Sequence, residues 1–86
     1  MEDVRARIAE FILEEMLFGD ESRMPAGGQS LLQSGVIDST GILELIEFIE
    51  TEFGVRVDDD DTIPENLDGI NRIAAFVQRK RVESQA

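Results

Sequence analysis

The chain has 86 residues and a formal net charge of −11, with 42% hydrophobic residues, no cysteine and no histidine. This length suits one small folded domain, and the hydrophobic fraction is too high for a disordered acidic chain. The absence of cysteine excludes disulfides and cysteine-based zinc sites, and it is consistent with a reducing cytoplasm. The acidic surface disfavours nucleic acid, which binds to clustered lysine and arginine.

The first predicted element is a helix that begins near Val4. Apolar residues recur at helical spacing from Val4 to Met16, with glutamates between them. Gly19, directly after Phe18, is a plausible end for this helix.

A long loop is predicted over residues 19–37, because Pro25 and several glycines and serines interrupt any periodic pattern. Loops of this length inside a small domain are usually functional or disordered. We expect four apolar residues to hold this one against the core: Leu31, Leu32, Val36 and Ile37.

The second predicted helix runs from about Ser39 to Phe53. Asp38 or Ser39 would serve as its N-cap, since both have short oxygen-bearing side chains, and Gly54 would end it. The apolar stripe that would face the core consists of Ile42, Leu45, Ile46, Ile49 and Phe53.

Two further helical segments follow. Thr62 and Pro64 indicate a short helical turn, and Asp68 is expected to cap the last helix. The buried stripe of that helix would be Ile70, Ile73, Ala74 and Val77. We expect residues 79–81, Arg-Lys-Arg, to complement its dipole.

These elements predict an all-α fold, a small bundle of three main helices plus one short helix. The whole chain, residues 1–86, would form a single domain. Its ordered core would cover about residues 3–81, and residues 82–86 would be a flexible tail. We expect a monomer without a signal peptide. We also expect no membrane-spanning segment, since no apolar run approaches the ~20 residues needed to span a bilayer.

The acidic charge is concentrated in one segment. Residues 38–61 contain nine acidic side chains and one basic one, Arg56, so this segment contributes −8 of the net −11. Such a surface would attract a basic protein partner. The aspartates at 58–61 lack the spacing of a calcium-binding EF-hand loop, so we expect no metal site.

Ser39 is the strongest candidate functional residue. It follows Asp38, stands at the start of an acidic amphipathic helix and is expected to face solvent. The chain has no histidine or cysteine, and no acid–base pair for catalysis can be identified, so we expect no catalytic residue and no enzyme activity. Ser39 therefore resembles a site of attachment more than a nucleophile that turns over substrate.

The sequence resembles the acyl carrier protein family in the broad sense, which includes peptidyl and aminoacyl carriers. The resemblance rests on Leu31-Leu32, on Gly35-Val36-Ile37-Asp38-Ser39, and on Glu44-Leu45 and Glu52-Phe53-Gly54. It implies that a phosphopantetheinyl transferase attaches a 4'-phosphopantetheine arm from coenzyme A to Ser39, and that Asp38 helps to hold the metal ion of that complex. The arm would bear acyl or aminoacyl cargo as a thioester.

The resemblance also implies further partners: an adenylating acyl or aminoacyl ligase or an acyltransferase, and downstream biosynthetic enzymes. Glu44 and Glu47 would contact them, and Thr40 and Gly41 would affect which ones dock. Thr40 stands where the family usually has a bulky aliphatic residue, and Gly41 where it usually has a larger side chain. These departures favour a discrete carrier of a specialised pathway.

Two other interpretations remain open. Ser39 could be only an N-cap, and the glutamates only a solvated helix face. The whole chain could be an unmodified acidic adaptor that uses the same fold to bind a partner. Met16, Phe48 and Phe76 are typical of core or rim positions, although a small apolar cleft for cargo between helices is compatible with the sequence.

Overall fold

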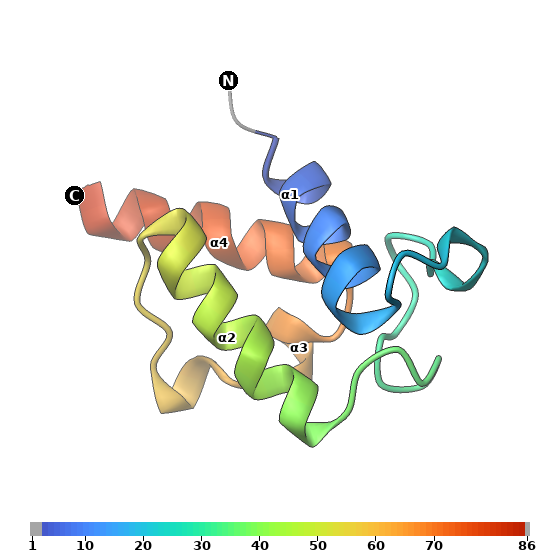
Figure 1. Ribbon diagram of the computed structural model, residues 1–86. Helices are drawn as coiled ribbons and strands as arrows, with labels where there is room; N and C mark the ends of the chain where they lie inside the picture. The colour runs from blue at the N-terminus through green and yellow to red at the C-terminus, as the bar shows by residue number, and fades with distance from the viewer. Residues whose placement is uncertain (1–2, 86) are drawn as a thin grey trace.

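The described part of the chain, residues 3–85, contains four α-helices in this computed structural model (Figure 1). They are α1 at Val4–Phe11, α2 at Ser39–Phe53, α3 at Pro64–Leu67 and α4 at Ile70–Gln85. No strand occurs within residues 3–85. The prediction of an all-α bundle with three main helices and one short helix is confirmed. The predicted flexibility of residues 82–86 stays a prediction, and Ala86 lies outside the described residues.

The first helix changes its geometry before it ends. After α1 the chain continues as a wider π-helical turn, η1, at Ile12–Met16, where the N–H of Leu17 donates to the carbonyl of Ile12 at 3.1 Å. The chain then leaves the helix through Phe18 and Gly19, both in the left-handed region, with φ of 53° and 84°. The helix therefore ends at Met16, slightly before the predicted end at Gly19, and its last turn is π-helical, which apolar spacing does not reveal.

The ends of α2 are fixed by local chemistry. Asp38 accepts a 2.8 Å hydrogen bond from the N–H of Gly41, which is the N-cap arrangement. Gly54 ends the helix with a φ of 66°, in the left-handed region that glycine adopts without a steric penalty. The predicted bounds, Ser39 to Phe53, are confirmed, and Asp38 rather than Ser39 is the cap.

The core lies where α1, α2 and α4 meet. α1 and α3 pack on α4, and the ring of Phe11 on α1 stacks on that of Phe48 on α2 with centroids 4.2 Å apart. No polar or charged side chain among the described residues is buried. The buried apolar residues are Val4, Ile8, Ile12, Leu17, Leu31, Val36, Ile37, Leu45, Ile49, Phe53, Val55, Leu67, Ile70, Ile73, Ala74, Phe76 and Val77.

The long loop between η1 and α2 contains one 3-10 turn, η2, at Glu21–Arg23. It is held to α4 by a 3.0 Å hydrogen bond from the N–H of Asn71 to the carbonyl of Gly27. Leu31, Val36 and Ile37 are buried as predicted. Leu32 is 41% exposed, so its expected place in the core was wrong.

Asp68 does not cap α4, contrary to the sequence-based prediction. Its carboxylate instead accepts hydrogen bonds from the Ser30 hydroxyl at 2.5 Å and from the N–H of Leu32 at 2.8 Å. Burial alone would raise the pKa of Asp68, but these hydrogen bonds outweigh burial and place the pKa below its usual value. Asp68 thus ties the α3–α4 junction to the loop that leads into α2.

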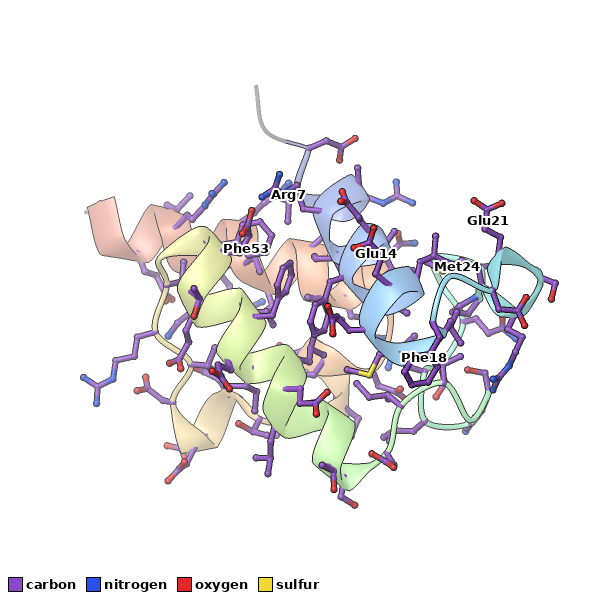
Figure 2. The ribbon with its side chains drawn as sticks, in the orientation of Figure 1. Arg7, Glu14, Phe18, Glu21, Met24 and Phe53 are labelled. Carbon is purple, nitrogen blue, oxygen red and sulfur yellow. The ribbon has the colours of Figure 1, made fainter. Side chains whose placement is uncertain are left out.

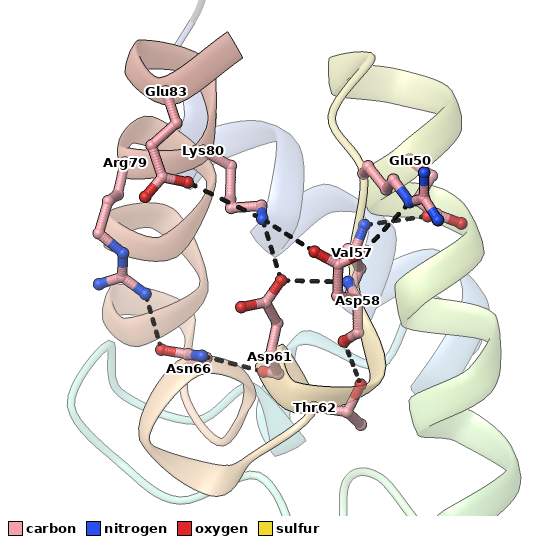
Figure 3. A network of polar contacts seen from close by, with 10 residues as sticks. Glu50, Val57, Asp58, Asp61, Thr62, Asn66, Arg79, Lys80 and Glu83 are labelled. Atoms are coloured by element: carbon pink, nitrogen blue, oxygen red, sulfur yellow. Dashed lines mark hydrogen bonds and ion pairs between the residues drawn. The ribbon is translucent and has the colours of Figure 1, made fainter.

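The basic residues near the C-terminus also differ from the prediction. Because α4 extends to Gln85, residues 79–81 lie before its last turn. Lys80 instead contacts Asp61 at 3.0 Å, at the end of the 3-10 turn η3 at Asp59–Asp61, and lies 3.7 Å from Asp58 (Figure 3). The hydrogen bond between Lys80 and Asp61 raises the pKa of the lysine and lowers that of the aspartate. Lys80 therefore stabilises the fold around η3.

Candidate functional site

Ser39 is the first residue of α2 and is exposed. Its hydroxyl makes no hydrogen bond to any residue between 3 and 85, because Asp38 already performs the capping role. The first N–H groups of a helix lack partners within the helix and favour a negative charge at this end. A negative charge attached to Ser39 would therefore lie at the end of the helix that favours it.

Asp38 has one carboxylate oxygen occupied and one available. Oδ1 accepts the N–H of Gly41, and Oδ2 has no hydrogen-bond partner within the described residues. The bond fixes the carboxylate next to Ser39 in the chain and leaves Oδ2 without a partner among the described residues. No cluster of three or more acidic residues suited to holding a metal ion occurs within residues 3–85, so a metal here would need ligands from elsewhere.

Gly41 is buried, unlike the other predicted partner-binding residues. A Cβ atom at this position would lie 2.7 Å from Cγ1 of Ile37 and 3.4 Å from Sδ of Met16. The glycine therefore lets the end of the loop and the η1 turn close against α2. Any influence of Gly41 on partners has to act through this packing, since it offers no exposed side chain.

Thr40, Glu44 and Glu47 are exposed on α2, as a docking role requires. Thr40 and Glu44 border an open hollow of about 270 Å³ next to Ser39. Its other edge includes Met16 and Phe18, and the Phe18 side chain is 88% exposed (Figure 2).

A small apolar cleft lies between α2 and α3. Its volume is about 70 Å³, and Ile42, one turn after Ser39, forms part of its wall. The remaining lining residues are Leu32, Ile37, Thr62, Ile63, Pro64, Leu67 and Asp68. Leu32, which is partly exposed, contributes to this cleft instead of to the core.

Three glutamates near the site were missed by the sequence reasoning. Glu10, Glu14 and Glu15 line a groove of about 570 Å³ together with Glu44 and Glu47 of α2. The acidic surface therefore continues from α2 onto α1 and η1. A helical projection of residues 4–16 could have placed these glutamates on one side, but it could not have shown that this side faces α2.

Comparison with known proteins finds partial matches to carrier proteins. No family model matches the chain. Curated D-alanyl carrier proteins of Streptococcus sanguinis and Streptococcus thermophilus are each 40% identical to it over 55 residues. That segment is 64% of this chain and 66% of each relative, so the match spans just under two thirds of their length. Within residues 3–85, no helix has the length and apolar character needed to cross a bilayer. Over these 55 residues the chain is similar to D-alanyl carrier proteins, which are small carriers of the acyl-carrier type.

Proposed function

We propose that this protein is a phosphopantetheine-bearing carrier, and that Ser39 is the attachment site. The observation that supports this best is the exposed Ser39 hydroxyl at the start of α2, without a hydrogen bond to the described residues and next to the fixed carboxylate of Asp38. The chain has no cysteine, so a thioester carrier needs a thiol from an attached arm. The arm would supply that thiol.

The attachment would proceed on a separate transferase. The Ser39 oxygen would lose its proton to that enzyme and form a bond to the phosphorus next to the pantetheine of coenzyme A. The bond from that phosphorus to the bridging oxygen of the pyrophosphate would break, and adenosine bisphosphate would leave with this oxygen. Oδ2 of Asp38 would bind the magnesium ion that the transferase brings, while Oδ1 keeps its bond to Gly41.

We further propose that the cargo is an aminoacyl group, loaded by an adenylating ligase. The relatives' name points to D-alanine as the first amino acid to test. The size of the apolar cleft supports a small cargo, because about 70 Å³ is less than half of the ~150 Å³ that benzene occupies in an engineered cavity. A long acyl chain would require this cleft to open.

Intact-protein mass spectrometry tests the attachment. The protein is incubated with coenzyme A, magnesium and a broad-specificity phosphopantetheinyl transferase. We expect one added arm and one titratable thiol in the wild type, and neither in Ser39→Ala. Ser22→Ala is a matched control, since Ser22 is also exposed but lies in η2, and it should be modified like the wild type.

An unmodified wild type would instead favour an acidic adaptor. Modification of Ser39→Ala would mean that another serine is the site. With the arm attached, an adenylating D-alanine ligase, D-alanine and ATP should add one alanyl group to the thiol, and hydroxylamine should release it. If a fatty-acyl ligase loads the protein and the D-alanine ligase does not, the cargo proposal is overturned and the attachment proposal still stands.

A further inference from the structure

Five carboxylates of a groove between α1 and α2 differ from others on the acidic surface in that they lack ion-pair partners within residues 3–85. The groove has a volume of about 570 Å³. Five glutamates line it, namely Glu10, Glu14, Glu15, Glu44 and Glu47, and none of them forms an ion pair within residues 3–85. The one basic residue in its wall, Arg7, already pairs with Glu52 at the end of the groove.

The aspartates of the α2–α3 segment are in a different situation. Asp58 and Asp61 bond to each other across η3, and Lys80 lies close to both carboxylates (Figure 3). Lys80 therefore compensates the negative charges of these two aspartates within the fold. In the groove, by contrast, like charges from two helices face one another without compensation, which raises the free energy of the isolated protein.

The floor of the groove is aromatic. Phe11 and Phe48 stack with an interplanar angle of 12°, and both rings are only partly buried. An apolar centre inside a charged rim is the usual composition of a protein–protein interface. The floor would take an apolar side chain, and the rim would take cations.

Phe18 extends this surface toward Ser39. The hollow beside Ser39 shares Glu15 and Glu44 with the groove, and Phe18 stands at its edge. Its φ of 53° is unusual for a bulky residue, because this region is open mainly to glycine. Because Phe18 is 88% exposed, its side chain makes little packing contact that could offset the cost of this backbone conformation in the isolated protein.

We propose that the groove between α1 and α2 is a docking surface for an amphipathic helix of a partner protein, with lysine or arginine on both edges of an apolar stripe. The proposal rests on the carrier function only in that the partner would be a protein of the same pathway. The five unpaired glutamates would bind its cations, the stacked rings would receive its apolar stripe, and Phe18 would contact its end nearest to Ser39. Nucleic acid and anionic membranes would be repelled by the same charges.

A synthetic peptide of about 18 residues, five helical turns, serves as the probe. It has a leucine stripe flanked by lysines, and a scrambled peptide of the same composition is its control. We expect the amphipathic peptide to shift the backbone amide NMR signals of Glu10, Glu14, Glu15, Glu44 and Glu47. Using Ser39→Ala as the test protein separates this result from the attachment proposal, since the groove needs no arm.

Three variants identify the surface. The double variant Glu14→Gln with Glu15→Gln should weaken peptide binding about fivefold, close to 1 kcal/mol. The control, Asp59→Asn with Asp60→Asn, makes the same charge change on exposed residues outside the groove and should weaken binding less than about twofold. Phe18→Gly should also weaken binding, without loss of stability, because glycine adopts the left-handed conformation readily.

Several results would overturn the proposal. Equal weakening by the two double variants, or equal affinity for the scrambled peptide, would reduce the interaction to net charge. Signal shifts centred on residues 58–61 would place binding elsewhere. Unchanged binding by Phe18→Gly would overturn the part of the proposal in which Phe18 contacts the partner.

Discussion

The hydroxyl of Ser30 donates a 2.5 Å hydrogen bond to the carboxylate of Asp68, 38 residues further along the chain. The same carboxylate accepts the N–H of Leu32. These bonds join the loop before α2 to the junction of α3 and α4. They therefore hold the segment that delivers Asp38 and Ser39 to the surface.

We expect Asp68→Ala to lower the free energy of unfolding by about 1–3 kcal/mol, because it leaves the Ser30 hydroxyl and the Leu32 N–H without their partner. Asp20→Ala is the matched control. Asp20 likewise bonds a serine hydroxyl and a backbone N–H, but only two residues away in an exposed turn. Urea unfolding at neutral pH measures both, and an Asp68→Ala effect no larger than that of Asp20→Ala would contradict the linking role.

The stabilisation by Asp68 should depend on pH. Because the pKa of Asp68 is lowered in the folded protein, its contribution is fully present above the ~3.9 of an unfolded aspartate and is lost as pH falls through the folded pKa. Asp61 acts in the same direction through its bond to Lys80. The difference in unfolding free energy between wild type and Asp68→Asn should therefore shrink on acidification from pH 7 to pH 3. A constant difference would show that the carboxylate charge is not involved.

Signals within one segment were enough to predict the helices. Asp38 and Gly54 fix the ends of α2 through local hydrogen bonding and backbone conformation, and Pro64 marks the start of α3 in the same way. The stripe of α4 from Ile70 to Val77 is buried as its spacing indicated. The geometry of the proposed attachment site follows from these local signals, since Ser39 is the residue after the cap.

Relations between distant segments could not be predicted. Asp68 was expected to cap the next helix, because a sequence shows that Gly69 and Ile70 follow but not that Ser30 and Leu32 lie within reach. For the same reason, the charge of Lys80 was expected to complement the dipole of its own helix and not to pair with Asp61. The face shared by Glu14 of η1 and Glu44 of α2 also depends on how two helices pack.

Gly41→Ala tests the packing beneath the proposed attachment site. Alanine would gain up to about 1 kcal/mol in helix propensity, but its Cβ would meet Cγ1 of buried Ile37, and such overpacking costs about 1–3 kcal/mol. We expect a net loss of stability and slower modification of Ser39. Thr40→Ala, at the exposed neighbouring position, should be neutral or slightly stabilising. A Gly41→Ala protein as stable as Thr40→Ala would contradict the close approach to Ile37.

Asp38→Asn separates the structural role of Asp38 from its proposed metal-binding role. The asparagine Oδ1 can still accept the N–H of Gly41, so stability should change by less than about 1 kcal/mol. The negative charge proposed to bind magnesium is lost, and we expect transferase modification to slow at least about tenfold and to need more magnesium. Thermal unfolding and modification rates over a magnesium series measure the two effects. Equal rates for both proteins would limit Asp38 to capping.

Glu44→Lys and Glu47→Lys test whether the exposed α2 glutamates steer the transferase. Both side chains are exposed and form no ion pair within the described residues, so each variant should remain folded. Charges at the edge of an interface act mainly on the association rate, and salt screens them over about 10 Å at 0.1 M ionic strength. We therefore expect slower modification at low salt and a smaller difference from wild type at high salt. Asp60→Lys makes the same charge change in η3, away from Ser39 in the sequence and outside the groove, and it serves as the control. If all three variants slow the reaction equally, the transferase responds only to net charge, and the glutamates of α2 are a solvated face.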